Sequence, residues 1–271
     1  MKILLNNSDL NEALSNVSNL GFVPTMGSLH KGHISLINQS QKKTNKTLVS
    51  IFVNPTQFNK IRDFKRYPIN KKKDLLILKK LKVDYVYIPT TKDIYNYKRK
   101  SKIKLAKNDH ILCAKFRKGH FEGVLDVMDR LVNLINPKKI FMGEKDFQQL
   151  YLVNKFINKK YKNKKIIHCK TIRDKNMLAL SSRNLLLDKK ELIKAGELAQ
   201  NLFLFKRSIR NFKDIKKVLI HKKVELIKLF NIKIDYLELR NKFNLKPSNK
   251  IKDSRIFIAY YIRKIRMIDN I

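Results

Sequence analysis

The most informative part of the chain is a segment near its N-terminus, LGFVPTMGSLHKGH at residues 20–33. Its first six residues predict a short buried strand that is closed by Pro24 and Gly27. A helix is expected to begin near Gly32. In this setting the imidazoles of His30 and His33, together with several free backbone N–H groups, are expected to face one spot beside the helix start. An anion there gains about 0.3–1 kcal/mol from the helix dipole alone, so the segment predicts a phosphate site.

On both sides of this segment, strand-like and helix-like stretches alternate with short connections. The predicted strands are residues 20–25, 47–53, 84–88, 139–142 and 165–172. Helices are expected from about residue 32, before residue 84, and over 124–135 and 147–158. This alternation indicates an α/β domain with a parallel sheet covered by helices. Right-handed crossovers then bring the carboxyl ends of its strands to one edge.

The pattern changes after about residue 171. Two helices, 189–204 and 213–230, precede two extended segments, 234–239 and 256–262. Helices followed by strands predict a smaller α+β unit with an antiparallel pair. A long linker and an internal repeat are both missing from the sequence.

The charge of the chain is its most conspicuous compositional feature. Among 271 residues there are 61 Lys and Arg against 22 Asp and Glu, a formal charge of +39. Dense positive charge favours nucleic acid, but residues 1–150 hold 29 of the 61 basic residues, so no basic tail exists. The chain also has 26 Asn and 31 Ile against 7 Gly, the composition that AT-rich codons produce. We therefore expect no specific nucleic-acid partner.

Hydropathy and cysteine content point to a cytoplasmic protein. The apolar fraction of 43% excludes a disordered chain. No apolar run approaches the roughly 18 residues of a membrane span, so no membrane partner is expected. The N-terminal residues become polar too early for a signal peptide. Cys113 and Cys169 are expected to be small buried side chains in a reducing compartment.

Three further segments carry polar groups suited to a substrate. Gly143-Glu144-Lys145-Asp146 lies between a strand and a helix, so Lys145 suits phosphate oxygens, while Asp146 suits either a nucleotide donor or a helix cap. Leu180-Ser181-Ser182-Arg183 offers two hydroxyls and a guanidinium, which suit a polyphosphate or, alternatively, a helix cap. Gln57 and Gln149 could contact a hydroxyl or carboxylate of a substrate, although single glutamines are more often structural.

Together these segments resemble the pantothenate synthetase (pantoate–β-alanine ligase) family, in the same order along nearly the whole chain. The matching stretches are FVPTMGSLHKGH at 22–33, SIFVNPTQFN at 50–59, GHFEGV at 119–124, FMGEKDFQQ at 141–149, LALSSRN at 178–184 and RMIDN at 266–270, which is similar to the family's C-terminal strand. The resemblance implies a Rossmann-like domain at residues 1–171 that binds ATP and pantoate. It also implies a smaller C-terminal lid domain at residues 172–271, and a homodimer.

The resemblance also implies a reaction and a set of site residues. The reaction is ATP-dependent condensation of pantoate with β-alanine through pantoyl adenylate, releasing AMP and pyrophosphate on the way to coenzyme A, with Mg²⁺ accompanying ATP. His33 is the implied proton donor, Gln57 contacts pantoate and β-alanine, and Gln149 contacts pantoate. The implied ATP-binding residues are Met26, Gly27, Ser28, Leu29, His30, Lys31, Gly32, His33, Gly143, Glu144, Lys145, Asp146, Ile172, Leu180, Ser181, Ser182 and Arg183.

Several positions depart from the family pattern. Lys71-Lys72-Lys73-Asp74 stands where an acidic helix start is usual, so the metal ligands are unknown and Asp74 is the one remaining candidate. Asn176-Met177 replaces the usual Asp-Gly, which predicts a stiffer or altered turn. Lys118 replaces Pro, and Asp126 replaces Thr. None of these departures touches His33, Lys145 or Gln57, so we expect the activity to be retained.

Two alternatives stay open at this point. Another HxGH nucleotidylyltransferase, or a class I aminoacyl-tRNA synthetase, would share the phosphate segment, but the latter requires a Lys-Met-Ser-Lys-Ser-like loop and an anticodon-binding region that this sequence lacks. A non-enzymatic RNA-binding protein would interleave aromatic and basic residues on a sheet. The one candidate for such a surface is Tyr85, Tyr87, Tyr95 and Tyr97 near Lys98–Lys100.

Overall fold

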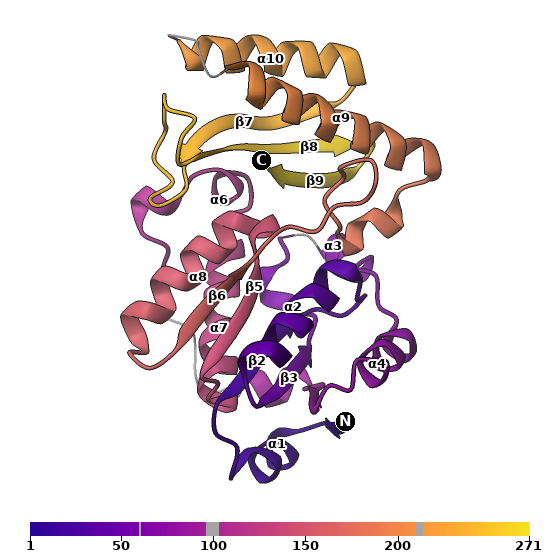
Figure 1. Ribbon diagram of the computed structural model, residues 1–271, viewed down its shortest axis with the longest axis vertical. Coiled ribbons are helices and arrows are strands. Elements are labelled where there is room, and N and C mark those ends of the chain that lie inside the picture. Colours follow the sequence, from indigo (N-terminus) through magenta and orange to yellow (C-terminus); the bar gives the residue numbers. More distant parts are fainter. Residues whose placement is uncertain (60, 96–102, 210–213) are drawn as a thin grey trace. The chain divides into compact units, whose positions relative to one another are not determined.

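The computed structural model describes residues 1–59, 61–95, 103–209 and 214–271 (Figure 1). Tyr97, Lys98–Lys100 and the predicted helix start at Lys213 lie outside these residues. By packing, the chain divides into two compact units. The first comprises Met1–Glu144 and Gln149–Lys170, and the second comprises Lys145–Gln148 and Thr171–Ile271. The division into functional domains at residue 171 stays a prediction.

The first unit is built on a six-stranded sheet. Its strands are β1 (Lys2–Leu4), β2 (Leu20–Thr25), β3 (Lys46–Ile51), β4 (Tyr85–Tyr87), β5 (Lys139–Gly143) and β6 (Lys165–Cys169). The α-helices are α1 (Asn7–Leu14), α2 (Lys31–Lys43), α3 (Ile61–Lys65), α4 (Lys71–Lys80), α5 (Thr91–Ile94), α6 (Cys113–Phe116), α7 (His120–Ile135) and α8 (Phe147–Lys160), of which the first residues of α8 belong to the second unit. Short 3₁₀ turns lie at Pro55–Gln57, Lys107–Asp109 and Glu144–Asp146.

Every neighbouring pair of strands in this sheet is parallel, in the order β1-β4-β3-β2-β5-β6. The predicted parallel α/β sheet is confirmed. Both of its faces are buried. On one face Val23 belongs to an apolar cluster with Ile37 of α2 and Leu78 of α4, and its neighbour Phe22, which points to the opposite face, is fully buried as well. Burial on both faces explains why the strands are almost continuously apolar.

The sheet has a topological switch point between β2 and β5. From β2 the chain adds β3 and then β4 on one side, whereas β5 returns to the other side of β2 and β6 follows it. Connections leave β2 and β5 in opposite directions, and open α/β sheets bind ligands outside the carboxyl ends of their strands at such a point. The segment at residues 26–33 and the segment that begins at Gly143 follow these two strands.

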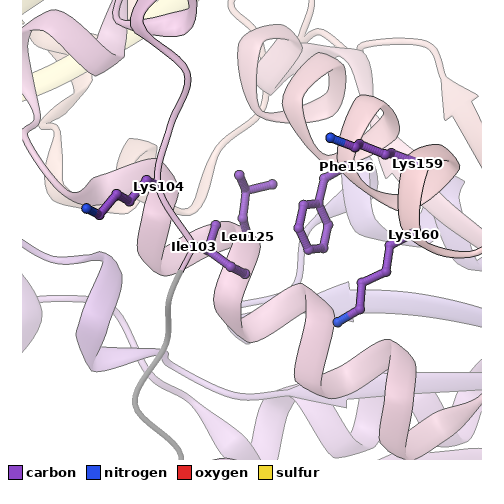
Figure 2. Close-up of a pocket in the computed structure, with 6 residues that line it drawn as sticks. All are labelled: Ile103, Lys104, Leu125, Phe156, Lys159 and Lys160. Atoms are coloured by element: carbon purple, nitrogen blue, oxygen red, sulfur yellow. The ribbon is translucent and has the colours of Figure 1, made fainter.

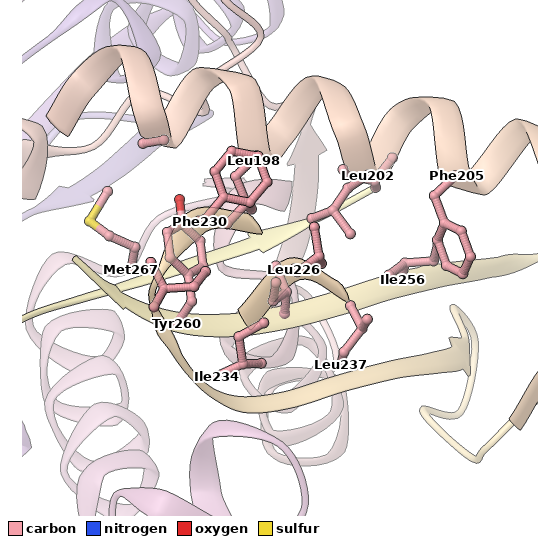
Figure 3. Packing of buried hydrophobic residues seen from close by; sticks show 14 of the residues in the cluster. Leu198, Leu202, Phe205, Leu226, Phe230, Ile234, Leu237, Ile256, Tyr260 and Met267 are labelled. Atoms are coloured by element: carbon pink, nitrogen blue, oxygen red, sulfur yellow. The ribbon is translucent and has the colours of Figure 1, made fainter. Parts of the chain in front are cut away.

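The second unit contains a three-stranded antiparallel sheet and two long helices. They are α9 (Lys189–Ser208), α10 (Ile215–Phe230), β7 (Lys233–Asn241), β8 (Ser254–Ile262) and β9 (Ile265–Asn270), with a 3₁₀ turn at Ser182–Leu186. Figure 3 shows Leu198 and Leu202 of α9 and Leu226 of α10 packed over Ile256 and Tyr260 of β8. The predicted small α+β unit is therefore confirmed.

The periodicity of the sequence missed several elements, and three of these misses have a clear physical reason. β1 is three residues long with two exposed positions, and α1 buries only Leu10, so neither has a readable apolar period. β9 ends in the buried polar residues Asp269 and Asn270, so its apolar period is interrupted; it pairs with β8 as a third strand, which the family resemblance of residues 266–270 indicated and the periodicity did not. The predicted strand at 165–172 ends earlier, at Cys169.

Several chemical features of the sequence have a clear place in the fold. Cys113 and Cys169 are buried free thiols, as predicted, and burial raises the pKa of Cys169 to about 11. Within the described ranges no helix combines the length and hydrophobicity that crossing a bilayer requires. Tyr87 is fully buried, so it cannot stack on a nucleic-acid base. In the same described ranges, ten residues other than glycine have positive φ, Ser28 and Met177 among them.

Gly21 in β2 tests how tightly α2 packs on the sheet. A Cβ at Gly21 would lie 2.2 Å from Ser40 Oγ and 2.4 Å from Thr44 Oγ1, in a buried hydroxyl cluster. Gly21→Ala is expected to lower the free energy of unfolding by about 1–3 kcal/mol, because the helix must shift. The measurement is urea unfolding followed by circular dichroism. Gly143→Ala in β5 is the matched control, because its Cβ would meet no atom within 4 Å; equal losses in both variants would contradict the prediction.

Candidate functional site

The segment between β2 and α2 is held by hydrogen bonds from its own backbone. Gly27 N–H donates to Thr25 Oγ1 at 3.1 Å, and Ser28 and Leu29 N–H donate to the Asp74 carboxylate at 2.8 and 2.7 Å. His30 N–H donates to His33 Nδ1, and Gly32 N–H donates to His30 Nδ1. The expectation of several free backbone N–H groups is therefore wrong for these five residues. These five amides are engaged by acceptors within the segment or by Asp74.

The two histidines cap the helix reciprocally. His30 is the N-cap residue of α2, and His33 Nδ1 accepts from the His30 backbone at 3.3 Å while His30 Nδ1 accepts from Gly32 at 3.1 Å. The ring centroids are 4.1 Å apart. A nitrogen that accepts carries no proton, so each neutral ring holds its proton on Nε2. Both imidazoles can therefore act as Nε2–H donors at the positive end of the helix.

Asp74 of α4 determines the path of this segment. Its side chain is 1% exposed, and its two oxygens each accept one backbone N–H, from Ser28 and Leu29. Gly27 and Ser28 have φ of 80° and 54°, and a Cβ at Gly27 would lie 3.0 Å from Asp74 Oδ2. The Asp74 carboxylate thus binds two backbone amides of a kind that, near a helix start, often binds a phosphate. It has no oxygen without an amide partner to offer a metal ion, and no group of three His, Cys, Asp or Glu in the described ranges could hold one.

The predicted substrate residue Gln57 lies on the turn after β3, and α7 holds this turn in place. Its side chain is buried, and its Nε2 contacts Met26 Sδ of the first segment. His120 Nδ1 donates to the Gln57 carbonyl at 2.7 Å, because His120 Nε2 accepts from Arg117 at 2.8 Å. The structure therefore brings Gln57 and Met26 together.

A second set of bonds supports the same turn. Asn54 Nδ2 donates to the Gly123 carbonyl at 3.1 Å, and Tyr95 donates to Asn54 Oδ1 at 2.8 Å. A Cβ at Gly123 would lie 2.5 Å from the Thr56 carbonyl, so glycine is required for this close approach. Burial raises the pKa of Tyr95 to about 12, so its hydroxyl stays a hydrogen-bond donor.

The segment after β5 supplies the next candidates. Gly143 ends β5 and Glu144 follows it in the first unit, and Gln149 lies on α8 in the same unit. In the second unit, Lys145 Nζ is 3.1 Å from Asp146 Oδ1. Asp146 is therefore an ion-pair partner of the lysine, a role that the sequence did not predict.

The remaining candidates lie on a hairpin of the second unit. Leu180 N–H donates to the Ile172 carbonyl at 3.0 Å, and Ser181 Oγ caps the following 3₁₀ turn by accepting from Arg183 N–H. Ser182 is buried. Met177, which stands where glycine is usual, has φ 68°, and Asp174 Oδ1 accepts from the N–H groups of Asn176 and Leu178. A left-handed residue other than glycine costs about 1–2 kcal/mol.

A separate hollow of about 480 Å³ lies elsewhere in the first unit (Figure 2). Figure 2 shows Leu125 and Ile103 beside Phe156, with Lys159 and Lys160 on α8. Lys160 pairs with Asp129. None of the predicted site residues lines this hollow, so it is distinct from the candidate site.

Sequence reasoning missed the residues that hold the site. Asp74 was considered only as a metal ligand and Tyr95 only as part of an RNA-binding surface, and Arg117 and His120 were given no role. The signal for His120 was present, since it lies in one of the glycine- and histidine-containing segments. A glycine close to a carbonyl, as at Gly123, is visible only in three dimensions.

The fold and this site define a class: doubly wound α/β proteins with a histidine-capped helix at the switch point of the sheet, suited to a nucleotide phosphate. Comparison with known proteins gives the family. The family model for pantoate-beta-alanine ligase matches residues 2–271, and the chain belongs to that family.

Individual relatives agree along the full length. The pantothenate synthetase of Helicobacter acinonychis is 39% identical over 277 residues, covering 100% of this chain and 99% of the relative. The crystal structure of pantothenate synthetase from Thermus thermophilus matches with a TM-score of 0.93 at 29% identity, covering 100% of this chain and 99% of that one. The Francisella tularensis pantoate-beta-alanine ligase, solved with beta-gamma ATP and beta-alanine, matches at 34% identity and a TM-score of 0.85, covering 100% of this chain and 97% of that one.

Asp74→Asn tests whether the buried carboxylate positions the histidine segment. The amide can accept only one of the two N–H groups. A hydrogen bond to a charged group stabilises the folded segment by about 1.5–3 kcal/mol. If that free energy must be supplied when ATP binds and reacts, kcat/KM for ATP should fall by about ten- to a hundredfold. Steady-state kinetics on folded protein provide the measurement.

Asp84→Asn is the matched control for this variant. Asp84 also accepts a backbone N–H, from Thr47 at 2.9 Å, but at the amino ends of the strands. It should keep kcat/KM within about twofold, since an interaction remote from the site leaves its geometry intact. Equal losses in both variants, or none in Asp74→Asn, would refute the role of Asp74.

Proposed function

We propose that this chain joins pantoate to β-alanine at the expense of ATP. One pantoate carboxylate oxygen attacks the α-phosphorus, the bond from that phosphorus to the bridging oxygen breaks, and pyrophosphate leaves. The amine of β-alanine then attacks the acyl carbon of pantoyl adenylate, the bond to the AMP oxygen breaks, and the amine loses a proton. The observation that carries this proposal is the histidine-capped start of α2 at the switch point, in a chain that matches the ligase family from residue 2 to residue 271.

The residues supply what this chemistry needs. A mixed anhydride requires two aligned substrates and neutralised phosphate charge, and no covalent nucleophile. We assign neutralisation of the phosphate charge to the Nε2–H groups of His30 and His33 and to Lys145 and Arg183, with His33 as the proton donor. Gln57 and Gln149 are assigned to bind pantoate, and Gln57 also to bind β-alanine.

The full assignment follows the motifs. ATP contacts are assigned to the segment Met26–His33, to Gly143–Asp146, to Ile172 and to Leu180–Arg183. In the division proposed here, residues 1–171 bind ATP and pantoate. Residues 172–271 act as a lid that excludes water, because an acyl adenylate hydrolyses in bulk water.

Mg²⁺ belongs to this proposal as part of the substrate MgATP. Asp74 is 1% exposed and both of its oxygens accept backbone N–H groups, so it does not fit a resident metal, and Asp146 pairs with Lys145. Mg²⁺ that accompanies nucleotides is held largely by phosphates and water. We further propose a cytoplasmic homodimer: the two free thiols fit a reducing compartment, and the dimer follows the family resemblance.

The decisive measurement is product formation from ATP, pantoate and β-alanine, with each substrate omitted in turn. Continuous formation of AMP is expected only when ATP, pantoate and β-alanine are all present. With pantoate labelled by ¹⁸O in its carboxylate, one label should appear in the AMP phosphate, because that oxygen bridges the adenylate. AMP formation without pantoate, or unlabelled AMP, would defeat the proposal.

His33→Ala tests the assigned donor. Adenylation should slow by about 100- to 1000-fold, because one preorganised donor to the phosphate is lost. His168→Ala is the matched control, since His168 is an exposed histidine on β6 and makes none of these contacts. Rapid-quench measurement of pyrophosphate release separates adenylation from the second step. Near-normal adenylation in His33→Ala would remove His33 from this role.

A further inference from the structure

The last two residues of β9 are buried polar side chains. Asp269 is 6% exposed and Asn270 is 3% exposed. Successive side chains of a strand point to opposite faces, so these two neighbours reach different parts of the second unit. β9 therefore ends in a pair of polar groups that connect two separate loops to the sheet.

Asp269 holds the hairpin at residues 173–179. Its two oxygens accept from Arg173 Nη1 and Nη2 at 2.7 and 2.8 Å, a bidentate pair with both side chains largely buried. Arg173 also donates to the Met177 carbonyl at 2.8 Å and to the Asn270 carbonyl at 3.1 Å. A bridge between Arg173 and Ala179 closes the hairpin, which leads directly into Leu180–Arg183.

Asn270 holds the loop that carries Lys145, through a hydrogen bond to the backbone of that loop. Asn270 Nδ2 donates to the Lys145 carbonyl at 2.9 Å, and Asn270 Oδ1 accepts from Arg255 Nη1 at 2.8 Å. The Arg255 guanidinium in turn lies 4.5 Å from the Phe147 ring centroid, and Phe147 packs edge-to-face on Phe257 of β8. These contacts fix the backbone position of Lys145 through its own carbonyl group.

We propose that Asp269 and Asn270 are positioning residues for ATP. Asn270 sets the backbone from which Lys145 extends, and Asp269, through Arg173, sets the hairpin that carries Ser181, Ser182 and Arg183. The inference rests on the proposed function, because Lys145 and these three residues are its assigned ATP contacts. It adds that the end of β9 aligns both Lys145 and the three residues of the hairpin.

The chemistry of Asn270 permits a sharp separation of its two bonds. Asn270→Asp keeps an oxygen for Arg255 but replaces the Nδ2 donor by an oxygen that repels the Lys145 carbonyl. Asn270→Ala loses both bonds. If positioning of Lys145 is what matters, both variants should be impaired; if only the Arg255 contact matters, Asn270→Asp should behave as wild type.

The measurement is steady-state kinetics with ATP and β-alanine varied separately, together with the urea midpoint of each variant. A misplacement of about 1 Å can reduce rates about a hundredfold. Asn270→Asp is therefore expected to lower kcat/KM for ATP by about ten- to a hundredfold, with KM for β-alanine changed by less than about twofold. Hydrogen exchange of peptides covering residues 143–149 should rise in the same variant.

Asp269→Asn and a matched control complete the test. Asp235 on β7 also has a buried carboxylate paired with an arginine, Arg266, at 2.9 Å, but it joins no assigned ATP contact. Asp269→Asn should lower kcat/KM for ATP and speed exchange at residues 171–184, whereas Asp235→Asn should lower only the urea midpoint.

Two outcomes would overturn the inference: wild-type kinetics for ATP in Asn270→Asp, or equal kinetic losses in Asp269→Asn and Asp235→Asn. Both would leave the proposed function intact, provided that the wild-type chain forms product. Failure of the wild-type chain to form pantothenate would instead defeat the proposed function, while the hydrogen-exchange comparison would still decide whether the strand end holds the two loops.

Discussion

The contact between Asp74 and the backbone of Ser28 and Leu29 is the constraint on which the candidate site depends. Without this contact, the N–H groups of Ser28 and Leu29 would be buried without these hydrogen bonds, which costs free energy. The contact therefore stabilises the positive φ of Gly27 and Ser28. With it, the turn places His30 at the helix start. The same carboxylate lies on α4, so the site is tied to the packing of α2 and α4 on one face of the sheet.

A common principle applies within each unit: buried side chains hold backbone, and backbone presents the side chains assigned to substrate. In the first unit His120 and Asn54 support the turn that carries Gln57. In the second unit Asn270 and Arg173 bind the carbonyls of Lys145 and Met177. Such arrangements suit a reaction that needs alignment of two small substrates and no covalent enzyme intermediate.

Much of the fold was predictable because it depends on local signals. β2 was predicted with its observed ends, and α2 and α7 were found from periodicity and glycine placement. The donor state of the histidines was not predictable, since it depends on which ring nitrogen accepts a backbone N–H. The role of Asp74 was also hidden, because it lies 45 residues from Leu29 in sequence. Contacts between distant residues leave no periodic trace, so the sequence predicted the candidate segments but not the side chains that hold them in place.

Ten described residues other than glycine have positive φ, whereas glycine with positive φ is found at Gly27 and Gly119. Asn and Asp tolerate this conformation, but Lys82, Leu112, Met177, Leu245 and Arg263 do not have that advantage. Each strained residue costs about 1–2 kcal/mol, against a net stability of about 5–15 kcal/mol for a typical protein. The chain therefore keeps left-handed turns at these five positions at a cost in backbone strain. Placing glycine at such positions offers a route to a more heat-resistant protein that leaves every assigned substrate contact in place.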